Sequence, residues 1–141
     1  MDFTNTVIIG RPPHDVFEFL ADFENVPKWN YAIEETHRTL DGPVGVGPTY
    51  AQTRSIPIRT QEAFAVVEYE RDRSLAIRGS IGPFEGTLTY NLEPVGDGTK
   101  LTNRADLAAH GLQRILAPVL QARVREAVAA NLTKLKELLE Q

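Results

Sequence analysis

The chain has 141 residues, of which 42% are hydrophobic and 24% are charged, and this composition is typical of one globular domain and not of a disordered segment. Its formal net charge is −4 and its lysines and arginines are scattered, so it offers no basic surface of the kind that binds nucleic acid or anionic lipid. Cysteine is absent, which excludes disulfides, thiolate metal sites and a cysteine nucleophile.

The first part of the chain predicts a strand followed by two short helices. Residues 2–9 alternate apolar and polar side chains with the two-residue period of a half-buried strand. Pro12 and Pro13 suit the first turn of a helix, and apolar residues then recur at helical spacing. Pro27 is expected to end this helical region, which leaves one short helical turn in residues 24–30.

The middle of the chain, residues 33–109, reads as a run of strands. Clusters of glycine, proline and polar residues interrupt it at 41–48, 71–74, 82–83 and 96–98. In the clearest strand, residues 84–92, an apolar face alternates with a polar one, and a glycine turn then joins it to the next strand as a hairpin. Because no helical segment separates the strands, they predict an antiparallel meander and not β-α-β units.

The end of the chain predicts one long amphipathic helix, because apolar residues recur there every three to four positions. Pro118 is expected to start a helical segment or to kink a longer one, since proline removes a backbone donor. The whole order of elements indicates an α+β fold. A twisted sheet of seven strands has one concave face, and a single helix cannot fill all of it, so we expect a cavity there.

Five segments carry a resemblance to a known family. They are PPHDVFEFLADFENVPKWN (12–30), GPVGVGPTY (42–50), VEYERDRSLAIRG (67–79), GPFEGTLTYNLEPVGDGTKLT (82–102) and NLTKLKELLE (131–140). In this order and spacing they resemble the START-like, or SRPBCC, superfamily, whose members include polyketide cyclases and dehydratases, lipid and hormone carriers, and chaperone-binding domains.

The resemblance implies one START-like domain over residues 1–141 with the helix-grip fold. In that fold a seven-stranded curved antiparallel sheet carries two short helices after the first strand, and a long C-terminal helix packs across the concave face. The resemblance also implies a pocket between the sheet and this helix, and it places Trp29, the only tryptophan, near the mouth of the pocket. Trp29 therefore either contributes to the rim of the cavity or packs as a wedge between elements.

Three polar residues fall on strand faces that otherwise look inward. Gln52 and Arg54 share a face with an apolar strand pattern, and Asn103 sits between Leu101 and Ala105. A buried polar group without a partner costs on the order of 1–3 kcal/mol, so such residues must be paired or face a cavity. We expect them to orient the polar end of an otherwise apolar ligand; alternatively, Arg54 faces solvent on an edge strand.

The expected walls of the cavity are aromatic and aliphatic. The candidates are Tyr50, Phe64, Phe84, Tyr90, Leu112 and Leu116. For each of them, packing in the core without any contact to a ligand is the alternative interpretation.

No catalytic set or metal site can be identified in the sequence. The three histidines, His14, His37 and His110, have no partner at the spacing of metal ligands, so neither a metal nor another cofactor is expected. The serines lie outside any nucleophile elbow, and the glycines of residues 42–47 precede a strand and not a helix, which favours a turn over a phosphate loop. The catalytic residues, if any, remain unknown.

Three functions are compatible with these observations. The first is binding of a small hydrophobic or aromatic molecule in the cavity. The second is a polyketide cyclase or dehydratase, in which Arg54, Tyr50, Tyr90 or Asn103 would polarise a carbonyl or move a proton. The third is a protein-interaction domain of the chaperone-binding kind. In each case we expect a cytoplasmic monomer or homodimer that binds no nucleic acid and has no membrane span.

Overall fold

The computed structural model describes residues 2–39, 47–109 and 117–141. Its elements, in chain order, are β1 (Asp2–Ile9), α1 (Pro13–Ala21), the short 3₁₀ helix η1 (Phe23–Asn25), α2 (Val26–Trp29), β2 (Ile33–Arg38), β3 (Thr49–Arg54), β4 (Thr60–Glu70), β5 (Ser74–Ile81), β6 (Phe84–Val95), β7 (Gly98–Ala109) and α3 (Ala117–Leu139).

The strands form one seven-stranded antiparallel sheet in the order β1-β7-β6-β5-β4-β3-β2. Strands β2 to β7 follow one another as a meander, while β1 pairs with β7 and so brings the two ends of the chain together. The predicted hairpin is confirmed, since β6 and β7 pair along their whole length from Val95 opposite Gly98 to Phe84 opposite Ala109. The α+β class and the meander predicted from the sequence are both confirmed.

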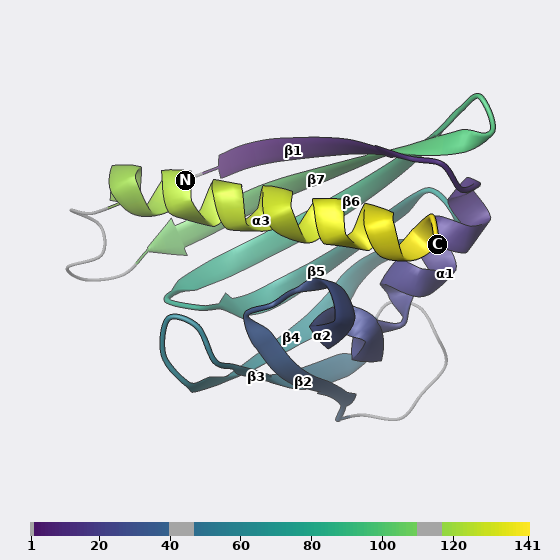
Figure 1. The fold of residues 1–141 in the computed structure, drawn as a ribbon. Helices are drawn as coiled ribbons and strands as arrows, with labels where there is room; N and C mark the ends of the chain where they lie inside the picture. The colour runs from purple at the N-terminus through teal and green to yellow at the C-terminus, as the bar shows by residue number, and fades with distance from the viewer. Residues whose placement is uncertain (1, 40–46, 110–116) are drawn as a thin grey trace.

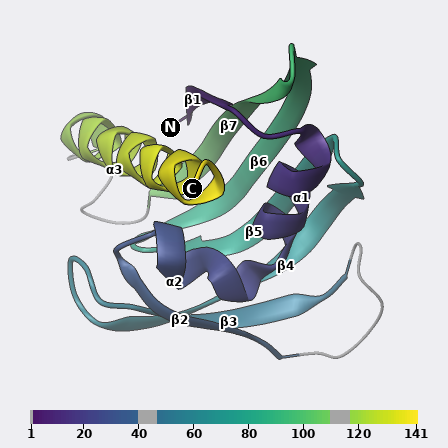
Figure 2. The ribbon, with the colours of Figure 1, turned by 45° about the vertical axis from the view of Figure 1, so that its right-hand side comes forward.

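Helix α3 lies along the concave face of the curved sheet (Figure 1). It packs against β1 and contacts α2, and α1 lies beside its C-terminal end (Figure 2). Pro118 falls in the first turn of α3, where its missing N–H costs nothing. Of the two possibilities expected from the sequence, a helix start or a kink, the structure shows the start. This arrangement is the helix-grip fold.

The prediction for Pro27 is wrong. Helix α2 does not stop at this proline but contains it in its first turn and ends at Trp29. Because the first N–H groups of a helix have no intrahelical partner, proline starts a short helix as readily as it stops one. The helix is closed by the Asn30 amide, which donates to the Val26 carbonyl at 2.8 Å.

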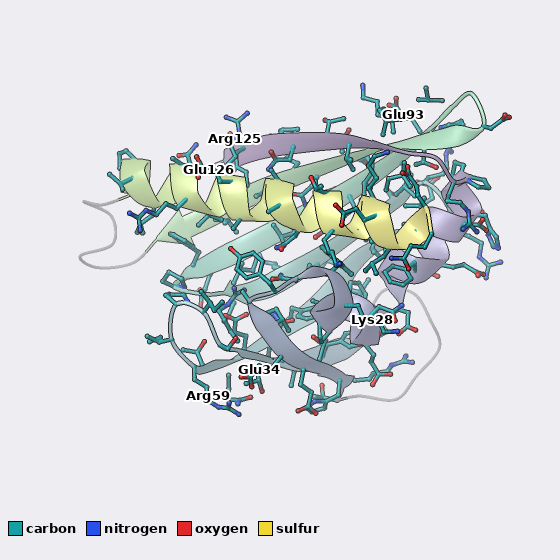
Figure 3. All side chains as sticks on the ribbon, in the orientation of Figure 1. Lys28, Glu34, Arg59, Glu93, Arg125 and Glu126 are labelled. Carbon is teal, nitrogen blue, oxygen red and sulfur yellow. The ribbon has the colours of Figure 1, made fainter. Side chains whose placement is uncertain are left out.

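Charged side chains mostly occupy the outer surfaces of the sheet and helix. Arg125 and Glu126 are exposed on α3, while Arg59 pairs with Glu34 of β2 at 2.9 Å on the sheet edge (Figure 3). Exposed pairs of this kind contribute little to stability.

Candidate functional site

A cavity of about 480 Å³ lies between the concave face of the sheet and the N-terminal half of α3. The α2–β2 connection, the β3–β4 loop and the β5–β6 turn complete its wall. From α3 the lining residues recur at helical spacing, so one face of the helix roofs the cavity. They are Leu120, Arg123, Val124, Ala127, Val128 and Asn131.

Two glycines face each other across β5 and β6, and one of them, Gly79, lines the cavity. Gly79 of β5 lies opposite Gly86 of β6 in the register of the sheet. A Cβ atom at Gly79 would overlap the carbonyl oxygen of Ala63, and one at Gly86 would overlap that of Asp106. The strands therefore approach one another more closely than side chains permit, and glycine is required at this bend.

The polar part of the wall comes from β3 and β4, with the β5–β6 turn above it. Glu62 of β4 accepts hydrogen bonds from Arg54 Nε at 2.6 Å and from Gln52 Nε2 at 2.8 Å. It also accepts the backbone N–H of Gly82 at 2.6 Å and Arg54 Nη2 at 3.3 Å. We call these four residues the Arg54 corner. Its two charged side chains are nearly inaccessible, 13% exposed for Arg54 and 2% for Glu62.

Glu62 was not recognised in the sequence. It has the same strand parity as Phe64 and Val66, both buried on the inner face, so the two-residue period of β4 did contain the signal. The charge of the residue argued for an outward orientation, because a glutamate is seldom buried unless it is paired. Its partner, Arg54, is supplied by a neighbouring strand, where only the sheet register brings the two together.

Trp29, which the resemblance placed near the mouth of the pocket, is among the residues that line the cavity. It is 7% exposed, and its indole meets the ring of Tyr90 edge to face at a centroid separation of 6.5 Å. Neither Trp29 Nε1 nor Asn131 Oδ1 has a hydrogen-bond partner within the described part of the chain, although both atoms are buried. Both residues line the cavity, but these two atoms are not accessible at its surface.

Tyr90 places a phenol in the same wall. Burial raises the pKa of this phenol well above its ordinary value, because the phenolate would be poorly solvated there. At neutral pH the group is therefore protonated. It can donate a proton or a hydrogen bond to a ligand, but it cannot serve as a base.

Six of the ten residues predicted to line the cavity do so. They are Trp29, Gln52, Arg54, Phe64, Phe84 and Tyr90. Their contact with a ligand remains a prediction. Leu112 and Leu116 lie outside the described residues.

Tyr50 and Asn103 do not line the cavity. Tyr50 stacks on Phe64 with ring centroids 5.3 Å apart and meets Phe23 edge to face at 4.9 Å, so it belongs to the aromatic core behind the wall. Asn103 is fully buried on the inner face of β7, as its neighbours in the sequence indicated. However, neither its Oδ1 nor its Nδ2 has a partner among the described residues.

The described histidines, His14 and His37, lie on the surface beside carboxylates. His14 lies 3.2 Å from Asp72 and 3.2 Å from Glu18, and all three side chains are accessible to solvent. His110 lies outside the described residues. Within the described ranges no cluster of three or more histidine, aspartate or glutamate side chains could hold a metal ion.

Comparison with known proteins places the chain in a family. It matches the family described as polyketide cyclase/dehydrase and lipid transport over residues 1–140. This match confirms the resemblance to the START-like, or SRPBCC, superfamily. No curated protein sequence matches the chain. Across the described residues, no helix has the length and apolar character needed to cross a membrane.

Several solved structures share the fold. The crystal structure of TTHA0849 from Thermus thermophilus is similar with a TM-score of 0.83 and 15% identity, covering 99% of this chain and 97% of that one. The Zhui aromatase/cyclase from Streptomyces sp. R1128 gives 0.79 and 15% identity, covering 99% and 93%. The Aha1 dimer from Colwellia psychrerythraea gives 0.68 and 18%, covering 99% and 96%. At these identities the similarity concerns the fold alone.

Proposed function

Since the chain belongs to the polyketide cyclase/dehydrase and lipid transport family, we propose that it binds a small, largely apolar molecule in the cavity beneath α3. A volume of about 480 Å³ suits a ligand of a few fused rings or a short folded chain. Most of the wall is aliphatic or aromatic, so burial of an apolar ligand would supply the main part of the binding free energy.

The observation that carries this proposal is the make-up of the cavity wall, in which aromatic and aliphatic side chains surround a few polar groups, Gln52 and Arg54 among them. A concave, mostly apolar site with a few placed polar groups is the usual form of a small-molecule site. The N–H groups of Gln52 and Arg54 that do not bond Glu62 could donate to an oxygen atom of the ligand. Binding would then suit an oxygenated ligand better than a plain hydrocarbon.

Binding can be tested with aminoanthracene, a neutral apolar fluorophore whose signal rises in a dry site. Excitation transfer from Trp29, the only tryptophan, reports that the probe is bound to the protein, and the variants described next report where. We expect saturable one-to-one binding at micromolar concentration, confirmed by native mass spectrometry. Failure of the wild-type protein to bind any apolar probe in this range would contradict the proposal.

A matched pair of variants on α3 separates cavity binding from surface binding. Val124→Asp places a charge in the cavity wall, whereas Val119→Asp places the same charge at a position on the same helix that is 59% exposed. Because an unpaired buried carboxylate is costly, we expect the first to weaken probe binding by about tenfold or more and the second to leave it unchanged. Equal effects of the two variants would mean that the probe binds elsewhere.

A cyclase-type reaction in the same cavity is the second candidate, and the Arg54 corner is the observation that favours it. Guanidinium N–H groups in a dry site stabilise the negative charge that develops on a carbonyl oxygen during enolisation. The difficulty is the base: among the described lining residues there is no aspartate, glutamate or histidine, and Tyr90 is held protonated. Turnover of a polyketide-like substrate that is lost in Arg54→Gln while binding persists would establish the enzyme.

A further inference from the structure

The buried carboxylate of Glu62 is saturated with donors. Its two oxygens receive four hydrogen bonds, two from Arg54, one from Gln52 and one from the Gly82 backbone. All four donors are N–H groups. A carboxylate has about four acceptor positions and can donate only when protonated, so Glu62 is ionised and has no acceptor left for a ligand.

The hydrogen-bond inventory of the Arg54 corner leaves mainly donors for a ligand, since the one side-chain acceptor position still open is the second lone pair of the Gln52 oxygen. An arginine has five N–H donors, and the two bonds of Arg54 to Glu62 leave three of them without a partner in the described structure. Gln52 uses one amide N–H on Glu62 and keeps the other, while its oxygen accepts the Thr36 hydroxyl at 3.3 Å. Both Gln52 and Arg54 line the cavity, whereas Glu62 lies behind them.

The net charge of the corner is zero, because the charges of Arg54 and Glu62 cancel at a separation of 2.6 Å. Among the described lining residues the only other charged group is Arg123, which is exposed to solvent on α3, so water screens its field. A ligand carboxylate at the corner would therefore lose its hydration without gaining a net counter-charge. An uncharged carbonyl oxygen could accept the same N–H groups and would lose far less hydration.

We infer that Glu62 is a specificity-determining residue that sets the cavity for ligands whose buried polar end is an uncharged carbonyl, such as a ketone, ester or quinone, and against carboxylates. This inference rests on the proposed function, because it concerns the ligand of the same cavity. Glu62 acts through Arg54 and does not touch the ligand itself. It holds the guanidinium side-on and cancels its charge, and through Gly82 it also ties the β5–β6 turn to the corner.

The test compares two ligands of nearly equal shape, acetylnaphthalene and naphthoate substituted at the same ring carbon. Each is titrated as a competitor of aminoanthracene, and the ratio of the two dissociation constants is measured for each protein. The wild-type protein is expected to prefer the ketone. Glu62→Gln leaves the charge of Arg54 uncancelled, so the ratio should move toward naphthoate by about tenfold or more.

Three further variants test whether the ratio of dissociation constants follows the charge of Arg54 and Glu62. Arg54→Gln leaves Glu62 unpaired and should move the ratio further toward the ketone, while the double variant Arg54→Gln with Glu62→Gln is neutral and should return it to near the wild-type value. Glu68→Gln makes the same chemical change at an exposed position of β4 and should leave the ratio unchanged. Circular dichroism and urea unfolding report which variants fold. If Glu62→Gln does not fold, the comparison of Arg54→Gln with the double variant still shows whether the charge of residue 62 changes the ratio.

The possible results separate the two proposals. If the wild-type protein binds neither aminoanthracene nor the naphthalene pair, the proposed function fails. If it binds them but folded Glu62→Gln keeps the wild-type ratio, the role of Glu62 is refuted while ligand binding stands. A wild-type preference for naphthoate would also overturn the inference. It would show that the positive charge of Arg123 or Arg54 attracts the ligand carboxylate in spite of Glu62.

Discussion

The two ends of the concave face use the same strands and the same helix in different ways. At the end beside α1, the C-terminal half of α3 packs into a closed core whose side chains are almost inaccessible, among them Ile9, Phe17, Leu101, Leu132 and Leu135. At the other end, the N-terminal half of α3 covers the cavity. We call these the packed end and the hollow end.

The difference between the ends comes from what fills the space between helix and sheet. At the packed end, helix α1 adds Val16, Phe17 and Leu20 to the buried cluster that also holds residues of the sheet and of α3. At the hollow end α3 presents short side chains such as Val124 and Ala127 to the cavity, and Gly79 of the sheet adds no side chain to fill it. One end therefore supplies stability, and the other keeps a volume that a ligand can occupy.

The largest expected difference between the two ends concerns truncation of α3. Leu135→Ala removes a fully buried side chain at the packed end, and we expect it to lower the free energy of unfolding by about 2–5 kcal/mol. Val124→Ala enlarges a space that already exists, so its cost should stay below about 1 kcal/mol. Urea unfolding measures both values. Similar losses at the two positions would contradict the division into a packed and a hollow end.

Substitution of Asn103 is expected to change the free energy of unfolding less, and to raise it instead of lowering it. Its side chain is fully buried and has no hydrogen-bond partner among the described residues, and it does not line the cavity. Replacing it by leucine, which has a similar shape, should raise the free energy of unfolding by about 1–3 kcal/mol and leave aminoanthracene binding unchanged.

Asn5, the partner of Asn103 across β1 and β7, provides the control. Its Nδ2 donates to the Arg125 carbonyl of α3 at 3.2 Å, so Asn5→Leu removes a bond that is made and should not stabilise the protein. Loss of ligand binding in Asn103→Leu would instead restore the role in orienting a ligand that the sequence suggested for Asn103.

The smallest effect tests whether the hollow end is dry. Burial raises the pKa of Tyr90, so above pH about 10 the unfolded chain loses this proton while the folded protein keeps it. The folded state then binds more protons than the unfolded state, and stability falls with rising pH by about 1.4 kcal/mol per pH unit from this group. Tyr90→Phe should flatten that alkaline decline, measured by urea unfolding between pH 9 and 11.

Tyr31 is the matched control, since it also lines the cavity but is 60% exposed at its mouth. Tyr31→Phe should leave the alkaline decline as it is in the wild-type protein. If Tyr90→Phe behaves in the same way, water solvates the phenol of Tyr90 and the cavity is not the apolar site that we propose.

The alternation of side chains was enough to predict most of the sheet. In β6, Phe84, Tyr90 and Leu92 are buried on the inner face as the two-residue period indicated. The same alternation placed the side chain of Asn103 on the inner face of its strand, and the structure confirms that this side chain is buried. Short-range order predicted these positions because the strand period is a local property of the backbone. Pro27 shows the limit, since the same residue can start or stop a helix and only its surroundings decide which.

The candidate site was predicted in part, and the errors share one cause. Arg54 and Gln52 were placed in the cavity wall, but Glu62, which holds them both, was missed, and Tyr50 was assigned to the wall although it lies behind Phe64. Facing inward is a property of one strand, whereas lining a cavity depends on which neighbouring side chain stands in front. That order is set by residues distant in the sequence.

The amino-acid sequence by itself determined the order of elements, the antiparallel sheet and its apolar inner face, because periodicity, turn residues and proline act over a few neighbouring positions. Only the tertiary structure decided where α3 leaves a cavity, which polar side chains line it, and that the charge of Arg54 is cancelled. These features require β3, β4, the β5–β6 turn and α3 to meet in space. The register of the sheet and the position of α3 across it bring them together, and no local pattern contains that information.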